Sequence, residues 1–230
     1  MESIYPEEVT IFAAVVLYGV PVAVAVLSYL LGCINGAIAT SHLFYHDDVR
    51  RHGSGNAGLT NFYRNYGAKC APMVIAFDMI KAVGAVLLGN YFLGYLLGWG
   101  AAGKYFGALF CIIGHMFPVF YGFKGGKGVL VAAGAILAVQ PVLLPVLALI
   151  FLVCLVPTGM VSLGSITMAA AYPVLTLVYS LMRGLPTRDV VVCTVGAAIM
   201  GGMVIWMHRS NIQRIRDGKE YRFGQKHKSN

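Results

Sequence analysis

The stretch Gly128–Val156, with the sequence GVLVAAGAILAVQPVLLPVLALIFLVCLV, decides how often this chain crosses a membrane. It contains no charged residue, but Pro141 and Pro145 interrupt it. Residues 128–139 are few for a membrane-spanning helix, which needs roughly 20 apolar residues. They could form a short helix, a re-entrant piece, or the first half of one long span that ends at Val156. The topology therefore depends on whether the chain turns near Gln140–Pro141.

The composition indicates that apolar helices make up most of the chain. Hydrophobic residues account for 58% of the 230 residues and charged residues for 11%, with a mean hydropathy of +0.75. In a soluble globular protein about a quarter of the residues are charged. We therefore expect an all-α integral membrane protein with a single polytopic membrane domain over residues 1–230. The predicted helices cover residues 9–44, 68–88, 105–121, 128–139, 142–156, 161–182 and 190–207, and a basic tail covers residues 208–230.

The distribution of lysine and arginine favours a turn at Gln140–Pro141. With that turn the chain crosses about seven times, and three basic segments fall on one side: the loops 50–69 and 124–127 and the tail 208–230. Without it, the tail moves to the opposite side. Because cytoplasmic loops carry an excess of lysine and arginine, we expect seven crossings, with the N terminus outside and the C terminus in the cytoplasm. No secretory signal peptide is evident, because the first residues are acidic.

A polar, glycine-rich island lies between the first two apolar blocks. It runs from His52 to Arg64 and reads HGSGNAGLTNFYR. Its glycines let the backbone approach a ligand closely, and its hydroxyl, amide and guanidinium groups suit an anionic, oxygen-rich ligand such as a phosphate. The candidate ligand-binding residues are Gly53, Ser54, Gly55, Asn56, Thr60, Asn61 and Arg64. An ordinary loop built from turn residues is the alternative interpretation.

A second island, Gly114–Val129, reads GHMFPVFYGFKGGKGV and joins two further apolar blocks. Its last glycines would expose N–H groups at a helix start, where the helix dipole favours an anion, and its lysines add positive charge. It is not a nucleotide-binding P-loop, because Lys127 is followed by glycine rather than serine or threonine. The candidate residues are Lys124, Gly125, Gly126, Lys127 and Gly128. Alternatively, the lysines mark only the membrane boundary.

Two smaller groups of polar residues accompany these islands. The segment His208–Arg214 follows the last apolar block, and His208 and Asn211 share a face if the helix continues through them. A histidine at a membrane boundary can also be a plain interfacial residue. Asp78 and Lys81 lie three residues apart within the second apolar block. We expect them to pair on a face that is turned away from lipid.

In chain order, these blocks resemble those of the bacterial acyl-phosphate:glycerol-3-phosphate acyltransferases (the PlsY family), integral membrane enzymes of phospholipid synthesis. Gly53–Arg64 resembles the family block GSGNxGATNxxR, with Leu59 in place of alanine. Gly114–Val129 resembles GHxFPVFxGFKGGKGV, Val161–Ile166 resembles VSLASI, and His208–Arg214 resembles HRxNIxR. Asp78 and Lys81 resemble an intramembrane Asp-x2-Lys. The resemblance covers nearly the whole chain.

The resemblance implies transfer of a fatty acyl group from acyl phosphate to the sn-1 hydroxyl of glycerol 3-phosphate, which gives lysophosphatidic acid and phosphate. It places this activity on the cytoplasmic face of a bacterial inner membrane. The implied catalytic residues are Ser54, Arg64, Lys127, His208 and Asn211. The implied substrate-binding residues are Gly53, Gly55, Asn56, Thr60, Asn61, His115, Lys124, Gly125, Gly126, Gly128 and Arg214.

Two points stay open in this interpretation. Either His208 or the phosphate of glycerol 3-phosphate would accept the hydroxyl proton. The implied partners are the two substrates and membrane lipid, and neither a cofactor, a metal ion nor a nucleic acid is implied. A membrane transporter of an organic phosphate is the alternative function, because glycine-rich breaks and a buried ion pair would also suit a transporter.

Overall fold

The computed structural model describes residues 13–223, which form helices and connecting loops without any strand. The main helices are α2 (Val20–Cys33), α3 (Gly36–Tyr45), α4 (Leu59–Tyr66), α5 (Ala71–Gly89), α6 (Ala101–Met116), α7 (Val129–Val139), α8 (Leu143–Thr158), α9 (Val161–Met182), α10 (Thr187–Met207) and α11 (Arg209–Arg216). Two π-helical segments extend them, η1 (Val15–Gly19) before α2 and η3 (Asn90–Leu96) after α5. Two short 3-10 turns are η2 (Val49–Arg51) and η4 (Val119–Tyr121).

Five helical segments of the described chain are long and apolar enough to cross a bilayer. They are Val15–Cys33, Ala71–Leu96, Ala101–Tyr121, Val161–Met182 and Thr187–Met207. The apolar helices α7 and α8 are shorter. The 11 residues of α7 reach only about 16 Å at a rise of 1.5 Å per residue, whereas the hydrocarbon core is about 30 Å thick.

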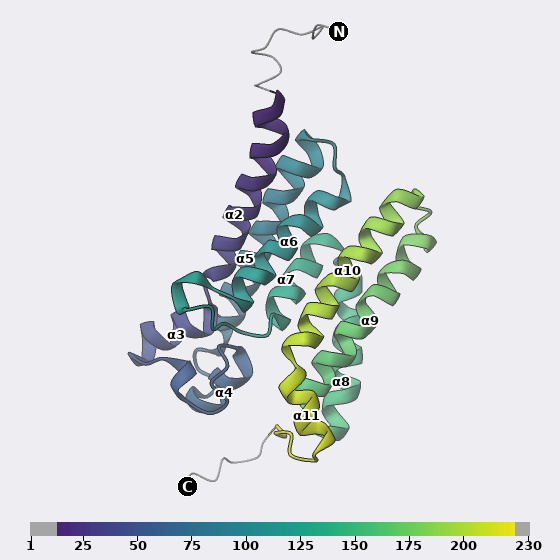
Figure 1. Cartoon of the computed structure of the whole chain (residues 1–230). Helices are drawn as coiled ribbons and strands as arrows, with labels where there is room; N and C mark the ends of the chain where they lie inside the picture. Colours follow the sequence, from purple (N-terminus) through teal and green to yellow (C-terminus); the bar gives the residue numbers. More distant parts are fainter. Residues whose placement is uncertain (1–12, 224–230) are drawn as a thin grey trace, which may run out of the picture.

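The chain turns between α7 and α8, as the sequence predicts. Helix α7 ends at Val139, and α8 begins at Leu143 after Gln140 leaves the helical conformation (φ −145°, ψ 72°). The apolar stretch Gly128–Val156 therefore forms two short helices and not one long span. In Figure 1, the axes of α2 and α5–α10 are roughly aligned with one another, and α3, α4 and α11 lie at the same end of the molecule.

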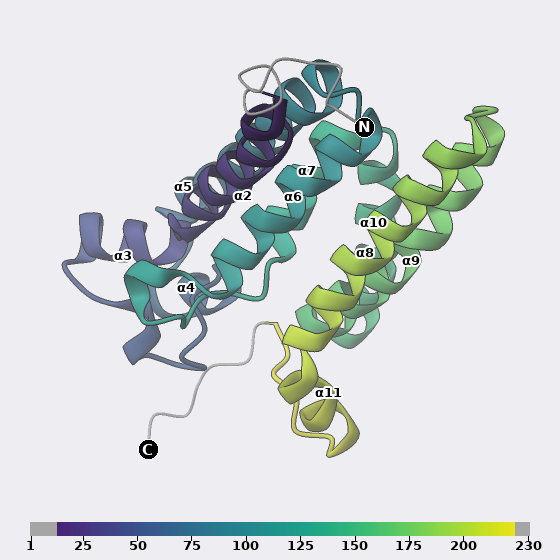
Figure 2. The same cartoon turned by 45° about the horizontal axis from the view of Figure 1, so that its top comes forward.

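The helices form two groups, which Figure 2 separates clearly. In one group α2 packs against α6, and α5 packs against α6 and α7; in the other, α9 packs against α8 and α10. Contacts between α6 and α10 join the groups, whereas α7 and α8 touch only slightly. The larger hydrophobic core draws its buried side chains from α5–α10, and a smaller one lies between α3, α4 and α5. The two groups are therefore joined mainly through α6 and α10.

The prediction of one helix over residues 9–44 was wrong within the described part, and residues 9–12 lie outside the described residues. Helix α2 ends at Cys33, Ile34 is extended (φ −71°, ψ 96°), and α3 starts at Gly36. Asn35 caps the new helix, because its side-chain oxygen accepts a hydrogen bond from the N–H of Ile38 at 3.0 Å. Apolar residues flank this break closely on both sides, so that hydropathy alone does not reveal it and Gly32 indicates only a possible bend.

Other predicted boundaries shift by a few residues. Helix α5 and its π-helical extension continue to Leu96, past the predicted end at residue 88. Helix α6 begins at Ala101 and ends at Met116, whereas the prediction covered residues 105–121. Helix α10 begins at Thr187 instead of residue 190, and α9 covers residues 161–182 as predicted.

Glycine allows α6 to pack closely against its neighbours. A Cβ atom at Gly107 would lie 2.1 Å from the carbonyl oxygen of Ala85 on α5. A Cβ atom at Gly114 would lie 2.1 Å from the carbonyl oxygen of Tyr29 on α2. Small residues permit such approaches between helices in membranes, where van der Waals packing drives helix association. These contacts hold the loop after α6 in a fixed position relative to α2 and α5.

We expect Gly107→Ala to lower the melting temperature of the detergent-solubilised protein. The added methyl group would overlap the Ala85 carbonyl, and overpacking of this kind costs about 1–3 kcal/mol. Gly84→Ala on α5 is the matched control, because a Cβ there meets no described atom within 4 Å and alanine is the better helix former. Equal melting temperatures for Gly107→Ala and the wild type would contradict the close approach of α5 and α6.

Candidate active site

A cavity of about 390 Å³ lies between the two groups of helices. The loop before α4, α4 itself and α7 line one side, and α8, α9, α11 and the segment after α11 line the other. Part of its wall is entirely apolar and comes from α7, α8 and α9. The apolar lining residues are Val129, Leu130, Ala133, Leu144, Ala148, Phe151, Val161 and Met168. This wall can accommodate a hydrocarbon chain.

The rest of the cavity wall is polar and carries a surplus of positive charge. The lining includes three cations, Arg64, Lys127 and Arg214. It also includes two carboxylates, but the charge of Asp78 is balanced by Lys81, so that only Glu220 offsets the three cations. Neutral polar groups complete this part of the wall: Ser54, Asn56, Thr60, Asn61, Ser162, Ser165, His208, Asn211 and Tyr221. A concave surface with excess positive charge attracts an anionic ligand.

Two helices begin at the cavity without a side chain that caps them. Gly58 precedes α4 and Gly128 precedes α7, and neither N terminus has a side-chain cap hydrogen bond. Both glycines line the cavity. The free N–H groups and the positive end of a helix dipole at such a terminus favour a phosphate. The cavity therefore offers two separate positions for anions.

The loop before α4 is held by Asn61, which is 2% exposed. Its side-chain oxygen accepts a hydrogen bond from the N–H of Ser54 at 3.0 Å. Its amide nitrogen donates to the carbonyl oxygens of Val49 at 2.9 Å and His52 at 3.1 Å. Both the oxygen and the nitrogen of the Asn61 side chain thus bind the loop, and they fix Ser54 at the cavity wall.

Glu220 organises the opposite side of the cavity. Its Oε1 accepts hydrogen bonds from Ser162 Oγ and Asn211 Nδ2, both at 2.7 Å, and its Oε2 accepts one from Arg214 Nε at 2.8 Å. The amide of Asn211 is thereby oriented so that its oxygen accepts a hydrogen bond from Lys127 Nζ. One buried carboxylate therefore links α9 and α11 to the loop that carries Lys127.

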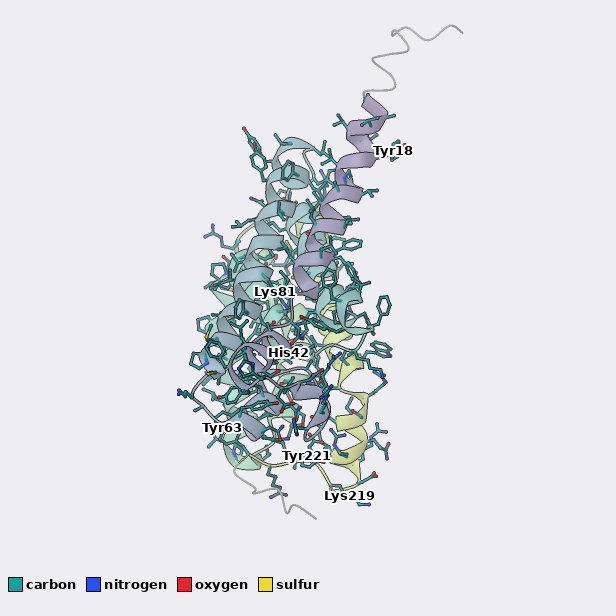
Figure 3. The ribbon with its side chains drawn as sticks, turned by 90° about the vertical axis from the view of Figure 1, so that its left-hand side faces the viewer. Tyr18, His42, Tyr63, Lys81, Lys219 and Tyr221 are labelled. Carbon is teal, nitrogen blue, oxygen red and sulfur yellow. The ribbon has the colours of Figure 1, made fainter. Side chains whose placement is uncertain are left out.

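The segment after α11 lines the cavity with Glu220 and Tyr221 and contacts both sides of it. The Arg64 guanidinium lies 5.1 Å from the centre of the Tyr221 ring, a cation–π contact. Tyr63 stacks on Phe223 with ring centres 5.6 Å apart, and the N–H of Phe223 donates to the Gly159 carbonyl at 2.6 Å. Figure 3 shows Tyr63 and Tyr221 at the same end of the molecule. This segment joins α4 of one helix group to the α8–α9 loop of the other.

Burial changes the acid–base properties of two cavity residues. Burial, together with the nearby positive charge of Arg214, lowers the pKa of Lys127 to about 8, so that the lysine can lose its proton in a mildly alkaline solution. Burial also lowers the pKa of His208 to about 4, which leaves this histidine neutral at pH 7. Its Nδ1 lies 2.7 Å from the Val204 carbonyl oxygen. Nδ1 therefore carries the proton, and Nε2 can accept one.

A buried group of charged residues lies at the base of the cavity. Lys81 Nζ is 2.8 Å from Asp78 Oδ1 and 3.0 Å from His115 Nδ1, and the predicted pairing of Asp78 with Lys81 is confirmed. Figure 3 shows Lys81 part-way along the molecule, away from the end that holds Tyr63. The His115 carbonyl accepts a hydrogen bond from the N–H of Gly126 at 3.1 Å. A Cβ at Gly126 would lie 2.3 Å from His115 Nε2, so that only glycine fits there.

The cavity brings together eleven of the sixteen residues that the sequence singled out. They are Ser54, Asn56, Thr60, Asn61, Arg64, His115, Lys127, Gly128, His208, Asn211 and Arg214. The condition for a shared helix face of His208 and Asn211 is not met, because α10 ends at Met207 and α11 starts at Arg209. His208 and Asn211 nevertheless both face the cavity.

Five candidates do not line the cavity: Gly53, Gly55, Lys124, Gly125 and Gly126. Gly53 and Gly55 have positive φ (56° and 69°) and shape the loop that carries Ser54. Lys124 is exposed, and its backbone carbonyl accepts a hydrogen bond from Arg50 at 3.4 Å. A charged side chain in a glycine-rich loop is thus insufficient to identify a cavity residue.

Sequence patterns did not identify Glu220, Tyr221, Ser162 or the apolar wall as parts of the site. Glu220 and Tyr221 reach the cavity because the chain reverses after α11, where Gly218 has φ 67°. The Asp217-Gly218 pair was the available signal, because this dipeptide is typical of turns. Among residues 13–223, no group of three histidine, cysteine or acidic side chains could hold a metal ion.

Comparisons with known proteins agree with one another. The family model described as "Glycerol-3-phosphate acyltransferase" matches residues 22–218. The glycerol-3-phosphate acyltransferase of Thermoanaerobacter sp. (strain X514) is 36% identical over 205 residues, which cover 89% of this chain and 96% of that protein. The enzyme of the same name from Neisseria meningitidis serogroup A / serotype 4A is 38% identical over 210 residues, which cover 91% of this chain and 100% of that protein.

Solved structures give the same result. The crystal structure of PlsY (YgiH), an integral membrane glycerol 3-phosphate acyltransferase, in its glycerol 3-phosphate form has a TM-score of 0.74 and 32% identity, over 89% of this chain and 96% of that one. Its lysophosphatidic acid form has a TM-score of 0.72 and 31% identity. This chain is an integral membrane protein and belongs to the glycerol-3-phosphate acyltransferase family.

Proposed function

We propose that this protein transfers a fatty acyl group from acyl phosphate to the sn-1 hydroxyl of glycerol 3-phosphate. One observation carries the proposal: a single cavity combines two uncapped helix N termini and three cations with an apolar wall. Two phosphate-bearing substrates, one of which has a hydrocarbon tail, need that combination. The products are lysophosphatidic acid and inorganic phosphate.

Glycerol 3-phosphate is assigned to the side of the cavity formed by α4. Arg64 presents a planar guanidinium that suits a phosphate, and the N terminus of α4 adds free N–H groups. Ser54 and Asn56 lie on the same wall and would hydrogen-bond the glycerol hydroxyls. Asn61 acts indirectly in this assignment, because its amide already holds the Ser54 loop.

Acyl phosphate is assigned to the side formed by α7. Lys127 and the uncapped N terminus of α7 would bind its phosphate, and the apolar residues of α7, α8 and α9 would hold its acyl chain. Lys127, Asn211 and Glu220 form one hydrogen-bonded chain, which restricts the motion of the ammonium group. A preorganised cation beside the leaving phosphate stabilises the charge that develops in the transition state.

The reaction requires one new carbon–oxygen bond. The sn-1 oxygen attacks the acyl carbon, the bond between that carbon and the phosphate oxygen breaks, and phosphate leaves with the electron pair. Two groups could take the hydroxyl proton: Nε2 of His208, or the phosphate of glycerol 3-phosphate. With the pKa of His208 near 4 and that of a phosphate monoester at about 6, we favour the substrate phosphate, with His208 as the group that orients the hydroxyl.

The same proposal includes the topology. We propose seven crossings, in which α7 and α8 form the two short ones, and we place the basic end of the molecule on the cytoplasmic side of a bacterial inner membrane. Local thinning of the bilayer would accommodate a crossing as short as α7. The N terminus would then lie outside. The excess of arginine and lysine in the loops next to the cavity supports this orientation. Glycerol 3-phosphate would reach the cavity from water, and the acyl phosphate would reach it from the bilayer.

The donor is tested with purified protein in lipid, labelled glycerol 3-phosphate, and either palmitoyl phosphate or palmitoyl-CoA. We expect labelled lysophosphatidic acid from palmitoyl phosphate alone, because the cavity provides a phosphate site next to an apolar wall. Product from palmitoyl-CoA alone would support acyl transfer to glycerol 3-phosphate but contradict acyl phosphate as the donor. Label that crosses sealed vesicles without any product would instead support an organic-phosphate transporter.

The activity should decrease as the pH rises through about 8. Lys127 is charged below its pKa of about 8 and neutral above it, so that alkaline solutions remove one of the three cavity cations. Anion binding by the free enzyme then weakens, and kcat/KM reports the pKa values of the free enzyme. A kcat/KM profile between pH 6 and pH 10 measures this effect. A flat profile through that range would contradict the proposed role of Lys127.

Lys124 supplies the matched control for this experiment. It lies in the same loop, but it is exposed and outside the cavity. Lys124→Ala should keep both the rate and the alkaline decrease of the wild type. Lys127→Ala should lose roughly 100-fold to 1,000-fold in kcat, the effect of removing one preorganised donor.

A further inference from the structure

The break between α2 and α3 is centred on Ile34, which is 45% exposed, but it is flanked on both sides by residues that water does not reach. Ile34 is extended there, and Cys33 and Asn35 on either side of it are completely buried. The last carbonyl groups of α2 and the first N–H groups of α3 therefore have no partners within their own helices. In apolar surroundings such groups need partners from elsewhere in the protein.

Asp78 and Lys81 of α5 supply these partners. Lys81 Nζ donates hydrogen bonds to the carbonyl oxygens of Gly32 at 3.0 Å and Ile34 at 2.6 Å, which end α2. Asp78 Oδ1 accepts a hydrogen bond from the N–H of Gly36, the first residue of α3, at 3.1 Å. Lys81 is 6% exposed and Asp78 is 1% exposed, and Lys81 Nζ lies 2.8 Å from Asp78 Oδ1. One ion pair thus fixes both ends of the break.

Asn35 occupies the position between these two ends. Its Oδ1 accepts a hydrogen bond from the N–H of Ile38 and caps α3, whereas its Nδ2 donates to the carbonyl oxygen of Ala57 at 3.0 Å. Ala57 is completely buried, and its neighbours Asn56 and Gly58 line the cavity. The side chain of Asn35 therefore connects the rigid helix break to the loop that forms one wall of the cavity.

We propose that Asn35 is a positioning residue for the binding of glycerol 3-phosphate. Through its hydrogen bond to the Ala57 carbonyl, Asn35 holds the loop of Ser54 and Asn56 in the geometry that binds this substrate. This inference rests on the proposed function, because that function assigns glycerol 3-phosphate to the α4 side. Asn35 does not line the cavity and does not touch the substrate. Asn35 hydrogen-bonds the loop of Ser54 and Asn56 only, whereas Lys127 and the α7 terminus belong to another loop, which meets the first one where Gly126 lies beside the Ala57 carbonyl.

Asn35→Ser tests the proposal, because serine also caps helices well but is too short to reach Ala57. We expect the KM for glycerol 3-phosphate to rise about tenfold, since a buried carbonyl loses its donor. The KM for palmitoyl phosphate should stay within about twofold, and the melting temperature should stay close to that of the wild type. Thr40→Val is the matched control. Thr40 lies on α3, is completely buried, and its hydroxyl has no hydrogen-bond partner among the described residues. It should leave both KM values unchanged.

Three results would overturn the proposal. One is an unchanged KM for glycerol 3-phosphate in Asn35→Ser. Another is an equal rise of both KM values, which would indicate general loosening of the fold. The third is failure of both Asn35→Ser and Asn35→Thr to fold, which would make Asn35 a structural residue only.

A failure of the proposed function can be recognised separately. In that case the wild type forms no lysophosphatidic acid from palmitoyl phosphate, and the Kd for glycerol 3-phosphate, measured by calorimetry, replaces its KM. Weaker binding to Asn35→Ser than to the wild type and Thr40→Val would still support the positioning role. Absence of glycerol 3-phosphate binding to the wild type would overturn both the function and the inference.

Discussion

The ion pair between Asp78 and Lys81 is the interaction on which the polar end of this protein depends. Charged side chains are costly within a bilayer unless they pair and face the protein interior. Here the pair also satisfies peptide groups at the α2–α3 break, and Lys81 contacts His115, whose carbonyl holds the loop of Gly126 and Lys127. An apolar helix bundle can therefore carry irregular polar loops at fixed positions next to its cavity.

The cavity has a polar and an apolar part because loops and helix ends form one part of its wall and the sides of helices form the other. The loops and helix N termini at the basic end supply hydrogen-bond donors and cations, whereas the sides of α7, α8 and α9 supply hydrocarbon. The two helix groups make only slight contact between α7 and α8. The segment after α11 joins the groups through Tyr221 and Phe223. This arrangement suits a reaction between a water-soluble phosphate and a lipid-like phosphate.

Much of this organisation could be predicted from the sequence, because hydropathy and glycine-rich motifs are local properties. Helix α9 and the Asp78–Lys81 pair follow from them. The turn at Gln140–Pro141 follows from the distribution of lysine and arginine, and most cavity residues follow from the polar islands together with the family resemblance. The helix break at Ile34 could not be predicted in full, because Gly32 indicated only a possible bend and the side chains that stabilise the break, Asp78 and Lys81, lie on α5. Glu220 was missed for a similar reason: only the reversal after Gly218 brings this tail residue to Asn211 and Ser162. Long-range contacts of this kind leave little trace in local sequence.

The most direct measurement is a crystal structure of this protein with glycerol 3-phosphate and a non-hydrolysable acyl phosphonate bound together. We expect the glycerol phosphate to contact Arg64 and the N terminus of α4, and the phosphonate to contact Lys127 and the N terminus of α7. The acyl chain should lie along Leu130, Ala133 and Phe151 on the apolar wall. Phosphate groups outside the cavity, or an acyl chain that leaves along any other surface, would contradict the assignment of the two substrates.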